Sequence, residues 1–97
     1  MLTVIESDLF VKQASEYLTD EQRLDFLAWL AKNPEAGDLI ANSDGARKIR
    51  VPLNQGKSGG ARVIYYRYDA HRLHAVLFYA KSQRSTIKGH DIKRHKK

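Results

Sequence analysis

The stretch from Arg47 to Lys81 decides the fold. It reads Arg47-Lys-Ile-Arg-Val51, then a Gly-rich basic loop from Pro52 to Gly60, then Arg62-Val-Ile-Tyr-Tyr-Arg-Tyr68 and Leu73-His-Ala-Val-Leu-Phe-Tyr-Ala-Lys81. The three runs are rich in β-branched and aromatic residues, and turn formers bound them. The sequence therefore predicts three consecutive strands, the last two joined by a tight turn at Asp69-Ala-His-Arg72.

Cationic side chains recur along these strands at a spacing that places several of them on one face of the sheet. Lys48 and Arg50 have the same parity on a strand, so both leave one face, while Ile49 and Val51 leave the other. A sheet that buries one side and presents Lys, Arg and Tyr on the other suits a polyanion, RNA above all. Any single cation could serve only to keep a sheet soluble, but their clustering favours a binding surface.

The charge of the chain is divided unevenly between its halves. The 97 residues carry a net charge of +6 and no cysteine, which excludes disulfides and thiolate metal sites. Residues 1–45 hold three cations against nine carboxylates, a balance of −6, and residues 46–97 hold fourteen against two, a balance of +12. The asymmetry predicts one surface for an anionic partner, on the half that is also rich in strands.

The cellular compartment and the need for cofactors are predicted from features that the sequence does not contain. It has no apolar run of membrane-spanning length and no basic leader, so we expect a cytoplasmic protein. No metal or other cofactor is expected. A histidine mechanism has little support, because His71 and His74 differ in strand parity and His90 and His95 lie in the polar tail.

The N-terminal half predicts a strand followed by two helices. Leu2 to Ile5 is a short strand, Ser7 or Asp8 caps the first helix, and Thr19-Asp-Glu-Gln22 fits a capping box for a second helix ending near Lys32. The two helices are expected to pack as a hairpin on one sheet face, with Leu24, Leu27 and Trp29 among the core residues. Leu39 and Ile40 are expected to tuck under the connector 35–46. Residues 1–88 then form a single domain, and residues 89–97 a basic, disordered tail.

Three segments together carry a family resemblance. Gly45-Ala-Arg-Lys-Ile-Arg-Val51, Gly56-Lys-Ser-Gly-Gly-Ala-Arg-Val-Ile-Tyr-Tyr66 and Leu77-Phe-Tyr-Ala-Lys81 resemble the RelE/ParE superfamily of bacterial toxins, most closely the HigB-like branch of type II toxin–antitoxin modules. The resemblance covers roughly residues 2–87. It implies an α+β, RelE-like small domain, in which an N-terminal strand and a helical hairpin pack on a curled, mainly antiparallel sheet.

The resemblance also implies an activity and its partners. RelE-like toxins are ribosome-dependent endoribonucleases (mRNA interferases), which cut mRNA in the A site through the ribose 2′-hydroxyl without a metal and so inhibit translation. The expected partners are the ribosome, its mRNA and a cognate antitoxin. Lys48 and Arg50 match basic residues of the family's catalytic face, and Arg62 matches the arginine that opens the next strand. Lys81 matches the family's basic segment after the last strand, and these four are the expected catalytic residues.

Further residues are expected to bind RNA around that site. Tyrosines offer a stacking face for an unpaired base. The candidates are Lys57, Tyr66, Tyr68 and Arg84, of which Arg84 matches the family's basic segment after the last strand. Where RelE itself has an arginine and a tyrosine in that segment, this chain has Ser82 and Lys88, so the acid and base are not assigned.

Two other functions are compatible with the same residues. The first is a ParE-like gyrase poison, and the second is a non-catalytic RNA-binding module with an inactivated C-terminus. The grouping of Lys48, Arg50 and Arg62 favours the ribonuclease, because a gyrase inhibitor has no need of a phosphate-facing cluster there.

Overall fold

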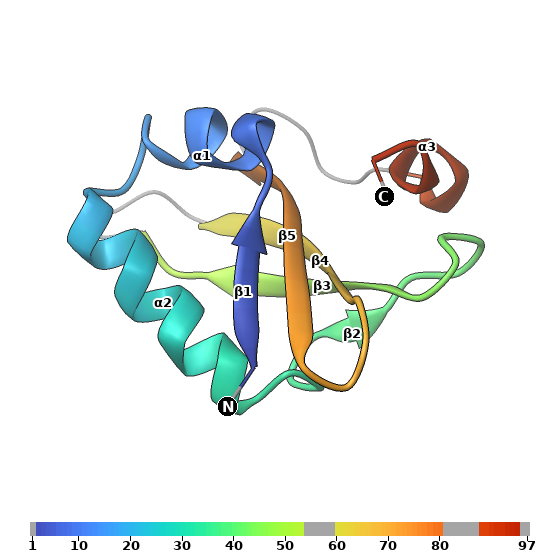
Figure 1. Cartoon of the computed structure of the whole chain (residues 1–97). Coiled ribbons are helices and arrows are strands. Elements are labelled where there is room, and N and C mark those ends of the chain that lie inside the picture. Colours follow the sequence, from blue (N-terminus) through green and yellow to red (C-terminus); the bar gives the residue numbers. More distant parts are fainter. Residues whose placement is uncertain (1, 54–59, 81–87, 96–97) are drawn as a thin grey trace.

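The computed structural model describes residues 2–53, 60–80 and 88–95, which form an α+β domain (Figure 1). The elements follow in the order β1 (Thr3–Glu6), α1 (Asp8–Ala14), α2 (Asp20–Lys32), β2 (Asp38–Leu39), β3 (Ala46–Val51), β4 (Ala61–Arg67), β5 (Arg72–Ala80) and α3 (Gly89–Lys93). The five strands make one mixed sheet in the order β1-β5-β4-β3-β2, in which β1 runs parallel to β5 and the other neighbours are antiparallel. The predicted α+β class is confirmed. None of the described helices is long and apolar enough to cross a membrane.

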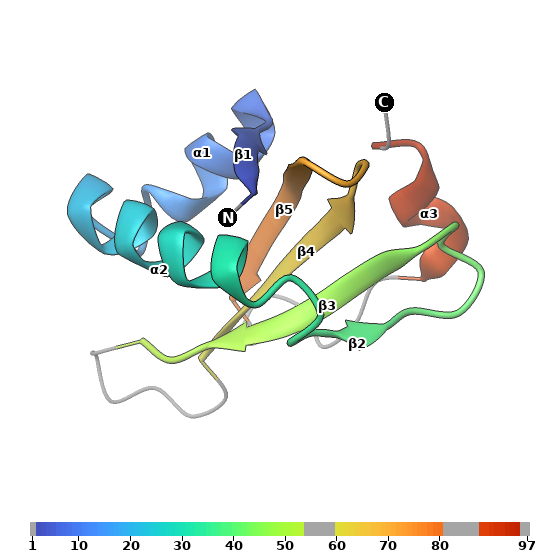
Figure 2. The same ribbon diagram turned by 60° about the horizontal axis from the view of Figure 1, so that its bottom comes forward.

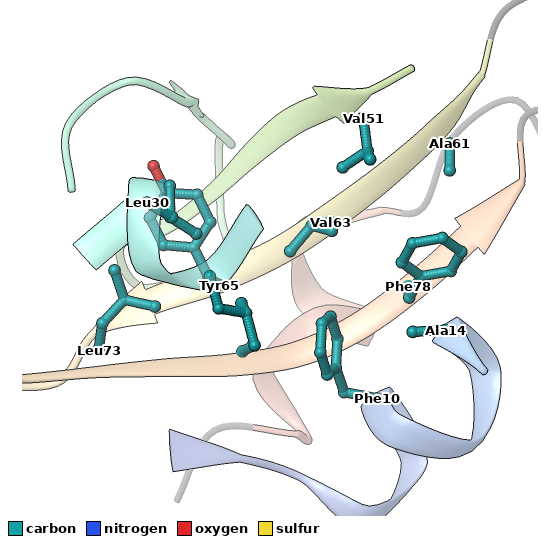
Figure 3. Packing of buried hydrophobic residues seen from close by; sticks show 11 residues of the cluster. Phe10, Ala14, Leu30, Val51, Ala61, Val63, Tyr65, Leu73 and Phe78 are labelled. Atoms are coloured by element: carbon teal, nitrogen blue, oxygen red, sulfur yellow. The ribbon is translucent and has the colours of Figure 1, made fainter. Parts of the chain in front are cut away.

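One face of the sheet is covered by α1 and α2, which lie together on the same side of it (Figure 2). Side chains of this helix-covered face interdigitate with both helices in the main core (Figure 3). The labelled members come from both layers: Phe10, Ala14, Leu30, Val51, Ala61, Val63, Tyr65, Leu73 and Phe78. The rings of Phe10 and Phe78 meet edge to face at 6.2 Å, an arrangement that aromatic pairs favour.

The starts of α1 and α2 are those that the sequence predicts. Ser7 caps α1, where its Oγ accepts a hydrogen bond of 3.0 Å from the Phe10 amide. Thr19 and Gln22 form the predicted capping box of α2, with reciprocal bonds of 3.1 and 2.9 Å. These contacts satisfy amides that a helix start otherwise leaves without partners.

The buried side of α2 differs from the predicted one. Trp29 is 47% exposed and Leu24 is 51% exposed, so the prediction that both belong to the core is wrong. Arg23 is buried instead and binds Glu6 of β1 and Asp20, each at 2.7 Å. The second half of α2 carries apolar residues on more than one side, so its periodicity did not identify the buried face. The paired guanidinium of Arg23 lies on the buried side with Leu27 and Leu30.

The opposite face of the sheet is covered in part by α3, near the start of β3 and the end of β4 (Figure 2). Ile92 of α3 is fully buried in a second cluster that contains Ala46, Ile64 and Tyr66. At Gly89 a Cβ atom would lie 1.9 Å from the Ala41 carbonyl oxygen, so only glycine permits this approach. The prediction of a disordered tail is therefore wrong for residues 89–95, where one isoleucine anchors a short helix.

The connector between α2 and β3 is tied to the core by Tyr65. The Tyr65 hydroxyl donates to the Pro34 carbonyl and accepts from the Gly37 amide, both at 2.9 Å. Leu39 lies in the two-residue strand β2 and is exposed, which overturns its predicted burial, whereas Ile40 is half-buried.

Candidate nucleic-acid interface

The register of β3 and β4 brings three cations onto the sheet face opposite α1 and α2. Ile49 pairs with Val63 and Val51 with Ala61, and these four side chains belong to the helix-covered core. Strand alternation then sends Lys48, Arg50 and Arg62 to the other side. We call these three residues the basic sheet face. A slip of one residue would bury all three, so the apolar pattern of β3 and β4 fixes their position.

Within the basic sheet face, two arginines lie directly opposite each other. Arg50 pairs with Arg62 across the ladder, and Arg62 pairs with Tyr79 of β5 on its other side. Lys48 pairs with Ile64 one step along the same face. Facing positions on antiparallel strands place Cβ atoms about 4.5–5.5 Å apart, so like charges there repel. An anion between the two guanidinium groups would remove that repulsion.

The hydrogen-bond partners separate Lys48 and Arg50 from the arginines outside the basic sheet face. Arg47, on the opposite face of β3, donates to the Gly37 carbonyl at 2.7 Å. Arg67 lies 3.8 Å from Glu35, and Arg72 binds Asp69 through two nitrogens. Lys48 and Arg50, in contrast, have no ion pair or hydrogen bond from their side chains within residues 2–53, 60–80 and 88–95.

The side chains of the basic sheet face differ in exposure. Arg50 is exposed, whereas Lys48 and Arg62 are half-buried. The Arg62 guanidinium donates to the carbonyl of Ala61 at 3.2 Å. Partial burial removes water from around a cation and strengthens its attraction for a bound phosphate.

The entry of the chain into β4 depends on a glycine. Gly60 has φ of +58°, and a Cβ atom there would lie 2.6 Å from the Val51 carbonyl oxygen. Glycine adopts this backbone conformation without steric cost. Gly60 therefore lets Ala61 pair with Val51, which sets the position of Arg62 opposite Arg50.

The predicted RNA-binding tyrosines have different environments. Tyr66 is 1% exposed and its hydroxyl donates to the Ser43 carbonyl, and burial raises the pKa of this phenol. Its ring lies under α3 with Ile92, so it offers no face to a base, which corrects the prediction for this residue. Tyr68 is 41% exposed and is open to solvent, as a stacking residue must be.

The other three predicted site residues, Lys57, Lys81 and Arg84, lie outside the described residues. Sequence reasoning missed the cations of α3, because the tail shows no apolar periodicity that would have indicated a helix. Lys88, His90, Lys93 and Arg94 are all exposed on this element. Among the described residues, no cluster of His, Asp or Glu side chains could hold a metal ion.

The arrangement can bind a phosphodiester. Planar guanidinium groups donate paired hydrogen bonds to phosphate oxygens and stay ionised at any physiological pH. The backbones of Arg50 and Arg62 are held in register by paired strands, so little ordering is required on binding.

No protein-family model matches the chain.

Proposed function

We propose that this chain is the toxin of a toxin–antitoxin module, and that it cuts mRNA on the ribosome at the basic sheet face. The observation that carries the proposal is the convergence of Lys48, Arg50 and Arg62 on one face of two paired strands. The order of one strand, two helices and, after the short strand β2, a three-stranded meander supports the proposal, because the family resemblance implies a strand, two helices and three strands in that order.

The proposed reaction is attack of a ribose 2′-oxygen on the adjacent 3′-phosphorus. The new O–P bond forms as the bond from phosphorus to the 5′-oxygen breaks. The 2′-hydroxyl loses a proton and the departing 5′-oxygen gains one, which leaves a 2′,3′-cyclic phosphate and a 5′-hydroxyl. Negative charge grows on the non-bridging oxygens of the phosphorane, where Arg50 and Arg62 are proposed to donate hydrogen bonds. Lys48 adds positive charge one step along the face. Such stabilisation lowers the barrier because it is stronger in the transition state than in the substrate.

The ribosome has a defined part in this proposal. Alignment of the attacking oxygen with the leaving oxygen is worth several kcal/mol of barrier, and a bound message held in the A site is already aligned. The proposed activity is therefore high on ribosomes and low on protein-free RNA. The message, the ribosome and a neutralising antitoxin are the proposed partners, in the cytoplasm.

A short induction of the chain in cells, followed by primer extension on mRNA and an assay for DNA breaks, tests the proposal. We expect discrete cuts inside translated frames, no DNA breaks, and loss of the cuts in an Arg50→Gln, Arg62→Gln double variant. DNA breaks without mRNA cuts would identify a ParE-like gyrase poison instead. Ribosome binding without cuts or breaks would identify a non-catalytic RNA-binding module.

A further inference from the structure

A second group of aromatic and cationic side chains lies at the tip of the β4–β5 hairpin. The Arg72 guanidinium lies over the Tyr68 ring, 4.6 Å from its centroid, and the His74 ring meets Tyr68 edge-on at 6.4 Å. Asp69 holds Arg72 through two side-chain bonds of 2.8 and 2.5 Å and accepts the His71 and Arg72 amides at 2.8 Å. These contacts fix Tyr68 while leaving 41% of it exposed. We call Tyr68, Arg72 and His74 the hairpin-tip cluster.

The hairpin-tip cluster belongs to the same side of the sheet as the basic sheet face. Tyr66, which packs against α3, pairs with His74, so His74 leaves that side too. The Tyr68 amide donates to the Arg72 carbonyl at 2.9 Å, so Tyr68 and Arg72 face each other two residues beyond the Tyr66–His74 pair. The side chains of Tyr68 and Arg72 therefore leave the same side of the sheet as those of Tyr66 and His74. Tyr68 follows Arg62 by six residues, which is about 20 Å of strand.

The surface between the two groups is cationic. Helix α3 covers the intervening part of this side, where Ile92 packs on Ala46, Ile64 and Tyr66. Within residues 88–95, each exposed side chain is a lysine, an arginine or a histidine: Lys88, His90, Lys93 and Arg94. A nucleic acid that leaves the basic sheet face over α3 therefore meets further positive charge before it reaches Tyr68.

We propose that the hairpin-tip cluster is a base-stacking subsite for an unpaired nucleotide of the same RNA strand whose phosphate lies at the basic sheet face. This inference rests on the proposed function. An exposed aromatic ring with a guanidinium plane over it suits a nucleobase, because aromatic rings and guanidinium planes both stack on the π-face of any base. A stacked strand rises about 3.4 Å per nucleotide, so about 20 Å corresponds to about six nucleotides as a minimum, because a path over α3 is longer than the strand beneath it. The subsite thus reads a position at some distance from the cut.

Binding of short single-stranded RNAs by fluorescence anisotropy tests the subsite. The probes are one oligonucleotide of about 12 nucleotides, which spans both groups, and one of about 3, which does not. Tyr68→Leu keeps apolar bulk but removes the ring, and Tyr68→Phe keeps the ring. Trp29→Leu is the matched control, because Trp29 is similarly exposed on α2, across the sheet.

The expected result is a length-dependent loss. Tyr68→Leu should weaken binding of the long probe roughly tenfold without changing its salt dependence, and leave the short probe unchanged. Tyr68→Phe and Trp29→Leu should bind both probes as the wild type does. Arg62→Gln should weaken both probes and lower the slope of log affinity against log salt by about 0.7.

The outcomes separate the subsite from the proposed function. If Arg62→Gln weakens both probes while Tyr68→Leu binds the long probe normally, the subsite is refuted and the basic sheet face stands. If Tyr68→Leu alone weakens the long probe, base stacking at Tyr68 stands, but the phosphate site at the basic sheet face, and with it the proposed function, is refuted. If the wild type binds neither probe, or if Tyr68→Leu weakens both probes equally, the subsite is also refuted.

Discussion

At the scale of single residues, the Arg50–Arg62 pair is expected to lower the stability of the fold while serving the proposed function. Two guanidinium groups on facing strand positions repel, and Lys48 and Arg50 have no carboxylate partner in the part of the chain that the structure describes. A sheet built for stability alone would place an opposite charge at one of these positions. Under the proposed function, an anion bound between the two arginines would offset this repulsion and explain their pairing.

The stability of Arg50→Gln tests this explanation. Removing one of two facing like charges should raise the free energy of unfolding by about 0.2–0.5 kcal/mol at low ionic strength, and the gain should vanish at high salt. Urea unfolding at two salt concentrations measures both effects. Arg67→Gln is the control, because Arg67 faces Glu35 across an exposed 3.8 Å gap and its loss should change little. A clear loss of stability in Arg50→Gln would contradict the repulsion.

Tyr65 offers a second prediction at this scale. Tyr65→Phe leaves the buried Gly37 amide without its acceptor, and should cost about 1–3 kcal/mol in urea unfolding. Leu39→Ala, in the same connector but exposed, should stay within about 0.5 kcal/mol. An equal effect of the two changes would show that the Tyr65 hydroxyl does not hold the connector.

The pH dependence of the Tyr65 contribution follows from its burial. Desolvation by burial raises the pKa of Tyr65, so the folded state favours the neutral phenol. The stability it adds is complete below the ordinary tyrosine pKa of about 10 and is lost as pH rises through the folded value. The alkaline fall in stability should therefore be shallower in Tyr65→Phe than in the wild type.

At the scale of elements, α3 behaves as part of the domain. Ile92→Ala should destabilise the chain by about 2–4 kcal/mol, because it opens a cavity between Ile64, Tyr66 and α3. Lys93→Ala, one residue on and exposed, should be neutral. Urea unfolding followed by tyrosine fluorescence reports both. If Ile92→Ala were as stable as Lys93→Ala, α3 would not pack on the sheet in solution.

The turn between β4 and β5 gives an element-scale prediction about acid. Hydrogen bonds from the Arg72 side chain lower the pKa of Asp69 to about 2. A lowered folded pKa adds stability that is present above the ordinary Asp value near 4 and is lost as pH falls toward 2. Asp69→Asn should flatten the pH dependence of the melting temperature across that window. A slope identical to the wild type's would contradict a paired Asp69.

Elements differed in how well the sequence predicted them, for identifiable reasons. The strands β3 to β5 carry alternation or long β-branched and aromatic runs, and Thr19 with Gln22 is a local signal, so these were predictable. Helix α3 has five residues and depends on Ile92 alone, which leaves no periodicity to detect. Tyr66 was misjudged because alternation gives the face of a residue but not whether another element covers that face.

At the scale of the whole molecule, the charge asymmetry of the sequence corresponds to the two sides of the sheet. The helices α1 and α2, from the acidic half, cover one side (Figure 2). The register of β3 and β4 places the basic sheet face on the other side, which α3 covers in part. A polyanion is thus attracted to one side and repelled from the other, which orients the protein before contact. The sequence predicted the basic surface and its strands, but the three-dimensional structure was needed to exclude Tyr66 from it and to add α3.

The most direct test of the central claim is the rate of mRNA cleavage on programmed ribosomes by Arg62→Gln and Arg67→Gln. Both arginines lie in β4 but leave opposite faces of the sheet, and circular dichroism would establish that both variants fold. We predict that Arg62→Gln slows cleavage about a hundredfold or more, as expected for losing a donor to the phosphorane, and that Arg67→Gln cuts at the wild-type rate. Equal rates for the two variants, or a slow Arg67→Gln beside an unimpaired Arg62→Gln, would contradict a catalytic role for the basic sheet face.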